Sequence, residues 1–131
     1  MVILIVGLRG CGKSTLAKEL IGSKGLAYDM DSIASAFRLR GPHEERFRPA
    51  RNMANDFFFG FLCKVQDYTD RVVIIRTAPR IEEVERICPD KVIWMRTRYV
   101  KRPMDDEDAA LKRIARLISW SEAAGIPVDV R

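Results

Sequence analysis

The chain has 131 residues, of which 47% are hydrophobic and 31% are charged, and its net charge is +5. This length suits a single domain spanning residues 1–131, and this balance of residues excludes wholesale disorder. The longest apolar run, residues 2–6, is far shorter than the ~20 residues that cross a bilayer, and no basic segment precedes it. We therefore expect a cytoplasmic protein without a signal peptide or membrane span.

The cysteines and the single histidine argue against several kinds of site. Cys11, Cys63 and Cys88 are odd in number and far apart, which disfavours a disulfide framework and a zinc cluster. Because His43 is the only histidine, neither a Ser-His-Asp triad nor a histidine-rich metal centre is expected. The positive charge comes mostly from arginine, which suits phosphate oxygens, but +5 fits an evenly solvated basic surface equally well.

The first half of the chain predicts two strands and three helices. Residues 2–6 form an apolar, mostly β-branched run that ends at a glycine, as in a parallel strand buried on both faces. A helix over 13–21, with Gly22 as its stop, should follow. After it we expect a short strand over 25–29, a short helix over 32–39 and a polar loop over 40–49. A long helix over 51–68 should follow, and its aromatic cluster should belong to the core.

The second half predicts three more strands and two more helices. The strands are expected over 71–76, 91–95 and 126–130. The helices are expected over 80–87, with Pro79 in the first turn, and over 111–124, which is amphipathic. In the amphipathic helix Leu111, Ile114 and Ile118 should point inward. Strands that alternate with helices predict an α/β fold, a three-layer sandwich around a parallel sheet of about five strands.

A glycine-rich motif joins the first strand to the first helix. Residues 7–14 read Gly-Leu-Arg-Gly-Cys-Gly-Lys-Ser and satisfy the pattern G-x-x-x-x-G-K-[ST], whose backbone N–H groups cradle phosphates. Lys13 should reach the β- and γ-phosphates of ATP, Ser14 should ligate Mg²⁺, and Thr15 should contact the α-phosphate. The candidate nucleotide-binding residues are Gly7, Arg9, Gly10, Cys11, Gly12, Lys13, Ser14 and Thr15. The alternative is a glycine-rich turn with a chance match.

The order of these elements resembles the small P-loop kinases of the P-loop NTPase superfamily, which include nucleotide kinases, shikimate kinase and the kinase domains of polynucleotide kinases. The resemblance rests on the motif and on a second strand that ends in Asp29-Met30-Asp31. It covers most of the chain and implies a nucleoside/nucleotide-kinase-like P-loop NTPase fold. It also implies that Asp31 orients and deprotonates the acceptor hydroxyl, with Asp29 as the alternative. Asp31 could also serve as the N-cap of the helix over 32–39.

The third strand departs from this family. Residues 76–80, Arg-Thr-Ala-Pro-Arg, are similar to the Asp-Gly-x-Pro-Arg turn of adenylate kinases, but Arg76 stands where those kinases carry an aspartate. Mg²⁺ would then rest on Ser14, the nucleotide phosphates and water, with Asp31 or Asp29 further out. Arg76 and Arg80 become candidates for binding an anionic acceptor, or else they are surface charges at a strand end.

Four basic residues follow the fourth strand, where small kinases carry a lid. The resemblance implies a short lid-like segment around residues 96–107, one of whose basic residues would neutralise charge in phosphoryl transfer. The family usually places these residues on a helical hairpin, whereas this stretch is short and contains Pro103. The basic residues are Arg96, Arg98, Lys101 and Arg102.

The sequence thus predicts an ATP- and Mg²⁺-dependent kinase with Lys13, Asp31, Arg96 and Arg98 as its catalytic residues. The γ-phosphoryl group would pass to a hydroxyl or phosphate acceptor, namely a nucleoside, a nucleotide or the 5′-hydroxyl of a nucleic acid. The missing carboxylate on the third strand favours an alternative, an ATP-binding accessory or switch module without a small-molecule acceptor. A nucleic-acid-binding module without catalysis is a third possibility. The acceptor and the oligomeric state stay open.

Overall fold

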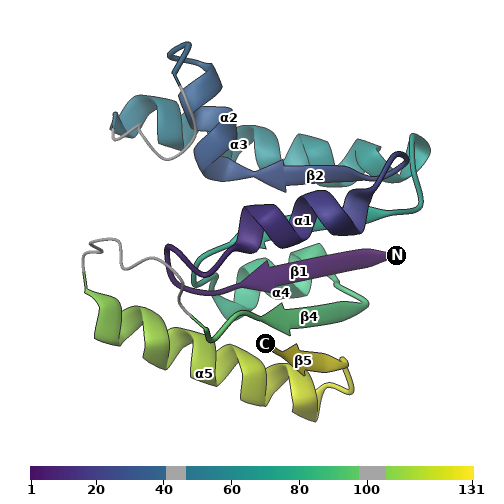
Figure 1. Ribbon diagram of the computed structural model, residues 1–131, viewed down its shortest axis with the longest axis vertical. Coiled ribbons are helices and arrows are strands. Elements are labelled where there is room, and N and C mark those ends of the chain that lie inside the picture. The colour runs from purple at the N-terminus through teal and green to yellow at the C-terminus, as the bar shows by residue number, and fades with distance from the viewer. Residues whose placement is uncertain (41–46, 98–105) are drawn as a thin grey trace.

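The computed structural model describes residues 1–40, 47–97 and 106–131. Their five strands form one sheet in the order β2-β3-β1-β4-β5, and every neighbouring pair is parallel. The strands are β1 (Val2–Val6), β2 (Leu26–Asp29), β3 (Val72–Arg76), β4 (Lys91–Trp94) and β5 (Val128–Val130). The predicted α/β class and the five-stranded parallel sheet are confirmed. Because all strands run the same way, their carboxyl ends meet at one edge of the sheet (Figure 1).

Helices cover both faces of this sheet. In the view of Figure 1, α1 and α5 lie in front of the strands, and α3 and α4 lie behind them. The helices of the described ranges are α1 (Lys13–Ile21), α2 (Met30–Ala36), α3 (Arg48–Lys64), α4 (Ile81–Ile87) and α5 (Glu107–Ala123), with a 3₁₀ turn η1 (Val65–Asp67) after α3. None of the helices in these ranges combines the length and apolarity that a membrane span requires.

The core explains why the central strands are continuously apolar. All five residues of β1 are buried, and in β3 only the last residue, Arg76, is partly exposed. A strand covered by helices on both faces has no solvent side, so both of its side-chain rows are apolar. Tyr28 in β2 packs on Phe58 of α3 and donates its hydroxyl hydrogen bond to the carbonyl of Ala54. These contacts hold α3 against the edge of the sheet.

Two helices begin at residues that the sequence does not predict. Asp29, not Asp31, is the N-cap of α2, and its carboxylate accepts a hydrogen bond of 3.2 Å from the backbone N–H of Asp31. The helix therefore starts at Met30, and Asp31 lies in its first turn. Arg80 is the N-cap of α4, so the expectation that Pro79 lies in its first turn is wrong.

The two long helices also differ from expectation, α3 in where it begins and both helices in which side chains they bury. α3 begins at Arg48, inside the expected loop, while residues 41–46 of that loop lie outside the described ones. Phe58 is 2% exposed and belongs to the core, but Phe57 is 57% exposed and does not. In α5, Ile114 and Ile118 are buried as predicted, whereas Leu111 is 39% exposed.

Candidate functional site

The glycine-rich loop between β1 and α1 has a backbone that other residues could not adopt easily. Gly10 and Gly12 have φ angles of 86° and 80°, and Gly12 is the N-cap of α1. A Cβ atom on Gly7 would lie 2.8 Å from the carbonyl oxygen of Met95, closer than real Cβ atoms approach. The motif glycines are therefore required by this fold, whatever the loop binds.

Lys13 folds back over this loop. Its ammonium donates hydrogen bonds to the carbonyl oxygens of Gly7, at 2.7 Å, and Leu8, at 2.8 Å. Burial lowers the pKa of Lys13 from its ordinary value of 10.5, and Cys11, Asp29 and Asp31 act in the opposite direction. The two carbonyl partners carry no net charge, so the positive charge of Lys13 is still available to an anion.

Asp29 connects three elements at the carboxyl edge of the sheet. Its Oδ2 accepts a hydrogen bond of 3.0 Å from the Ser14 hydroxyl on α1 and one of 3.2 Å from the Ser32 hydroxyl on α2. Its other oxygen, Oδ1, caps α2 through the N–H of Asp31. Both oxygens of Asp29 thus help to hold Ser14 and the start of α2.

The oxygen atoms of Ser14 and Asp29 fit Mg²⁺ chemically. Mg²⁺ prefers oxygen ligands and is commonly held by one or two protein oxygens together with substrate phosphates and water. Within the described ranges no group of three or more His, Cys, Asp or Glu side chains could hold a metal ion by itself. A magnesium ion held here by Ser14 and Asp29 would take its other ligands from water or from phosphate oxygens.

A cleft of about 1240 Å³ opens above the glycine-rich loop, and it brings together most of the predicted site residues. Those that line it are Arg9, Gly10, Gly12, Lys13, Ser14, Thr15, Asp29, Asp31, Arg76 and Arg80. Gly7 and Cys11 are not in the lining, and Cys11 is buried and borders a separate cavity of about 330 Å³. Residues from separate parts of the chain thus converge on one hollow.

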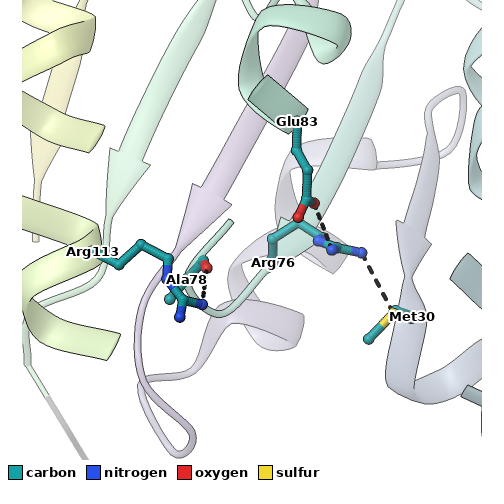
Figure 2. A network of polar contacts seen from close by, with 5 residues as sticks. All are labelled: Met30, Arg76, Ala78, Glu83 and Arg113. Atoms are coloured by element: carbon teal, nitrogen blue, oxygen red, sulfur yellow. Dashed lines mark hydrogen bonds and ion pairs between the residues drawn. The ribbon is translucent and has the colours of Figure 1, made fainter. Parts of the chain in front are cut away.

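Arg76 lines this cleft and forms an ion pair with Glu83. Its Nη2 lies 2.6 Å from Oε2 of Glu83, its Nη1 donates to the sulfur of Met30 at 3.4 Å, and its side chain is 12% exposed (Figure 2). The guanidinium carbon lies 5.6 Å from the centre of the Phe58 ring. The end of β3 therefore carries an arginine whose charge Glu83 largely offsets.

Of the four predicted lid residues only Arg96 is described, and it does not line the cleft, whereas Asp106, near the end of the predicted lid-like segment, does. The guanidinium of Arg96 lies 5.0 Å from the centre of the Trp94 ring, and Arg96 borders the smaller cavity. Arg98, Lys101, Arg102 and most of the lid-like segment at 96–107 lie outside the described residues. Arg113 of α5 lines the cleft instead, and its Nη1 donates to the carbonyl of Ala78 at 3.1 Å (Figure 2).

Sequence reasoning missed several polar residues of the cleft, and three of them lie on α3. Arg51, Asn52 and Asn55 reach it from α3. Their spacing is a local signal, because residues three and four positions apart along a helix share one side, and Asn55 lies three residues after Asn52 and four after Arg51. The side chains of Glu83 and Arg113 had no such signal, since only the packing of α4 and α5 brings them to the cleft.

Comparison of the chain with known protein families finds no matching family, and comparison with curated proteins finds no match either.

Proposed function

We propose that this chain has a P-loop NTPase fold of the nucleoside/nucleotide-kinase type and is an ATP-dependent phosphotransferase. One observation carries the proposal. Lys13 and Ser14 of the glycine-rich motif line the same cleft as Asp31, at the carboxyl edge of a parallel sheet. Ligands of open α/β sheets bind in the crevice at this edge. An anion-binding loop and a carboxylate that faces a common space are what phosphoryl transfer to a hydroxyl requires.

The triphosphate of ATP would bind at the loop over residues 7–15. The backbone N–H groups at the start of α1 point their positive ends at an anion, and the helix dipole favours negative charge there. The ammonium of Lys13 would exchange the carbonyl oxygens of Gly7 and Leu8 for phosphate oxygens. Ser14, with Asp29 behind it, would hold a magnesium ion, which neutralises charge on the phosphate oxygens.

Asp31 would take the proton of the acceptor. The hydroxyl oxygen forms a bond to the γ-phosphorus, the bond from that phosphorus to the bridging oxygen of ADP breaks, and the hydroxyl proton passes to the Asp31 carboxylate. Asp29 has a structural role instead, because its carboxylate caps α2 and accepts hydrogen bonds from Ser14 and Ser32. A phosphate acceptor has an ionised oxygen and would not need the base.

The arginines of the cleft would stabilise the charge that spreads over the transferred group. Arg113 and Arg80 approach the cleft from different elements, α5 and the turn before α4. Fixed positive groups that face a partly desolvated phosphoryl group are worth more there than in bulk water.

Transfer of label tests the proposal. The protein is incubated with γ-labelled ATP, Mg²⁺ and separate panels of nucleosides, nucleotides and 5′-hydroxyl oligonucleotides, with Lys13→Ala as the control. We expect label in one panel with the wild-type protein and transfer about 10²- to 10³-fold slower with Lys13→Ala. If no acceptor in any panel takes up label while ATP still binds, the kinase proposal is wrong.

The end of β3 favours a second candidate function. Arg76, paired with Glu83, stands where a kinase of this kind would carry a carboxylate near its metal ion. An ATP-binding switch module with slow hydrolysis has less need of that carboxylate. It would change its association with a partner when nucleotide binds, which sedimentation with and without Mg²⁺ and ATP would reveal in a mixture with candidate partners.

A further inference from the structure

A polar stripe on α3 leads out of the cleft toward the amino end of that helix. It consists of Arg48, Arg51, Asn52 and Asn55, whose spacings of three, four and seven residues place them on one side of a helix. Arg51, Asn52 and Asn55 line the cleft, and Arg48 lies about one turn nearer the helix start, where it is exposed. The stripe is about 10 Å long at 1.5 Å per residue. It therefore extends beyond the space that a single small acceptor would fill.

An exposed aromatic ring stands where the stripe ends. Phe47, the residue before α3, is 50% exposed, and the guanidinium of Arg38 lies 4.6 Å from the centre of its ring. An aromatic side chain at a protein surface offers a stacking partner for a nucleic-acid base, and an arginine beside it can contact the neighbouring phosphate.

The charge of this region matches a polyanion. The described residues 37–40 and 47–57 contain four arginines, at positions 38, 40, 48 and 51, and one acidic residue, Asp56. No acidic residue lies in the first turn of α3. Basic residues alternate here with an exposed ring and two amides, which is the arrangement that single-stranded nucleic acids bind.

We propose that the surface formed by Arg38, Phe47, Arg48, Arg51, Asn52 and Asn55, here called the α3 surface, binds single-stranded nucleic acid. A base stacks on Phe47, the arginines contact successive phosphates, and the strand enters the cleft past Asn52 and Asn55. In this arrangement the terminal 5′-hydroxyl reaches Asp31 and is the acceptor of the phosphoryl group, a step that rests on the function proposed above. A duplex binds less well, because the faces of its bases are already stacked.

Binding is measured separately from catalysis. Fluorescence anisotropy follows labelled 5′-hydroxyl oligonucleotides of DNA and of RNA, single-stranded and duplex, at several salt concentrations without ATP or Mg²⁺. We expect binding of the single strand that weakens steeply as salt rises, and weaker binding of the duplex. Phe47→Leu should weaken binding roughly tenfold, and Phe47→Trp should restore it. Arg48→Ala should weaken binding and make the salt dependence less steep.

Two matched variants control for general effects. Phe57 is about as exposed as Phe47 and lies in α3, but on another side of the helix from the polar stripe, against Phe37. Arg116 is an exposed arginine of α5, a helix that lies at the opposite end of the molecule from α2 and α3 in Figure 1. Phe57→Leu and Arg116→Ala should bind oligonucleotides as the wild-type protein does. Thermal melting of each variant verifies that it is folded.

The outcomes separate this inference from the proposed function. The inference that the α3 surface binds nucleic acid is wrong if oligonucleotide binding is undetectable at low salt or falls equally in Phe47→Leu and Phe57→Leu. This holds even if nucleosides accept label from ATP. Binding that depends on Phe47 and Arg48 upholds the surface, even if no oligonucleotide accepts label and the kinase proposal fails. If the Phe47 and Arg48 variants change only self-association, the surface is an interface between copies and the inference is wrong.

Discussion

Two neighbouring strands of the sheet lead to basic side chains that have different hydrogen-bond partners. β1 and β3 pair so that Val6 lies opposite Arg76, and each strand leads to a basic side chain in the same cleft. Lys13, which follows β1, donates only to backbone carbonyls of its own loop among the hydrogen bonds in the described structure. Arg76, at the end of β3, is held by Glu83 of α4 and Met30 of α2.

This difference indicates where an anion can bind most strongly. Carbonyl groups satisfy the donors of Lys13 without cancelling its charge, so a phosphate group can replace them with a gain in electrostatic energy. Glu83 already offsets Arg76, so an anion that binds Arg76 must compete with a carboxylate at 2.6 Å. In this account Lys13 provides binding energy for ATP, and Arg76 mainly organises the walls of the cleft.

The largest effect is expected from Lys13→Ala. Removing the ammonium should lower the rate of phosphoryl transfer by about 10²- to 10³-fold, the usual loss when one donor to a transition-state anion is deleted. The fold should persist, because the variant also removes a buried charge. Initial rates and thermal melting check both points, with Lys18→Ala, an exposed residue of the same helix, as the control. Equal rates in the two variants would contradict the role of Lys13, and an unfolded Lys13→Ala would make that residue structural.

The next largest effect separates the two aspartates. Asp31→Asn should keep ATP affinity and lose about 10²-fold or more in transfer to a hydroxyl, since general bases contribute factors of that size. Asp29→Asn retains an oxygen for the helix cap but loses the charge beside Ser14, so it should weaken the dependence on Mg²⁺ instead. Single-turnover rates and a magnesium titration distinguish these results. Undiminished transfer by Asp31→Asn would remove that residue from the mechanism.

The ion pair at the end of β3 predicts a smaller change, and one of stability. Glu83→Gln leaves a largely buried arginine without its charged partner, and we expect the free energy of unfolding to fall by about 1–3 kcal/mol. Urea unfolding measures this loss against Glu82→Gln, a neighbouring exposed position. The freed guanidinium should also bind inorganic phosphate more tightly than in the wild-type protein. If Glu83→Gln matches Glu82→Gln in stability, the pair does not hold the cleft together.

The smallest effect is a pH dependence of stability. Because burial lowers the pKa of Lys13 below its ordinary 10.5, the unfolded chain binds more protons between these two values than the folded chain does. The contribution of Lys13 to the free energy of unfolding should therefore rise as pH rises through that alkaline window. Below the pKa of Lys13 in the folded protein, the ammonium is charged and the full loss of stability from burying it is present. Urea unfolding at several alkaline pH values, compared with Lys13→Ala, isolates this contribution. If the stability of the wild-type protein relative to Lys13→Ala stays constant or falls as pH rises through this window, the prediction is contradicted.

The parts that the sequence predicts well are continuous segments. The buried run of β1, the glycines and the start of α1 at Lys13 follow from neighbouring residues, because close backbone approach and helix initiation are local requirements. Asp29 and Asp31 are both acceptable helix caps, and the predicted end of the second strand at residue 29 is correct. Which of the two carboxylates accepts a backbone hydrogen bond at the start of α2 is not decided by residue type alone.

The parts that the sequence does not predict come from tertiary packing. Glu83 and Arg113 read as surface charges of amphipathic helices, and only the placement of α4 and α5 beside the end of β3 brings them to the cleft. The position of Arg96 also depends on packing, since its guanidinium lies against the face of the Trp94 ring and borders the smaller cavity. The acceptor side of the site is therefore harder to predict than the loop over residues 7–15.

Calorimetric titration of the protein with ATP and Mg²⁺, repeated with Lys13→Ala, tests the central claim most directly. We predict saturable heat for one site per chain in the wild-type protein, a higher melting temperature in the presence of nucleotide, and the loss of both in the variant. No heat and no change in melting temperature, or equal binding by the two proteins, would contradict the claim that this loop binds a triphosphate.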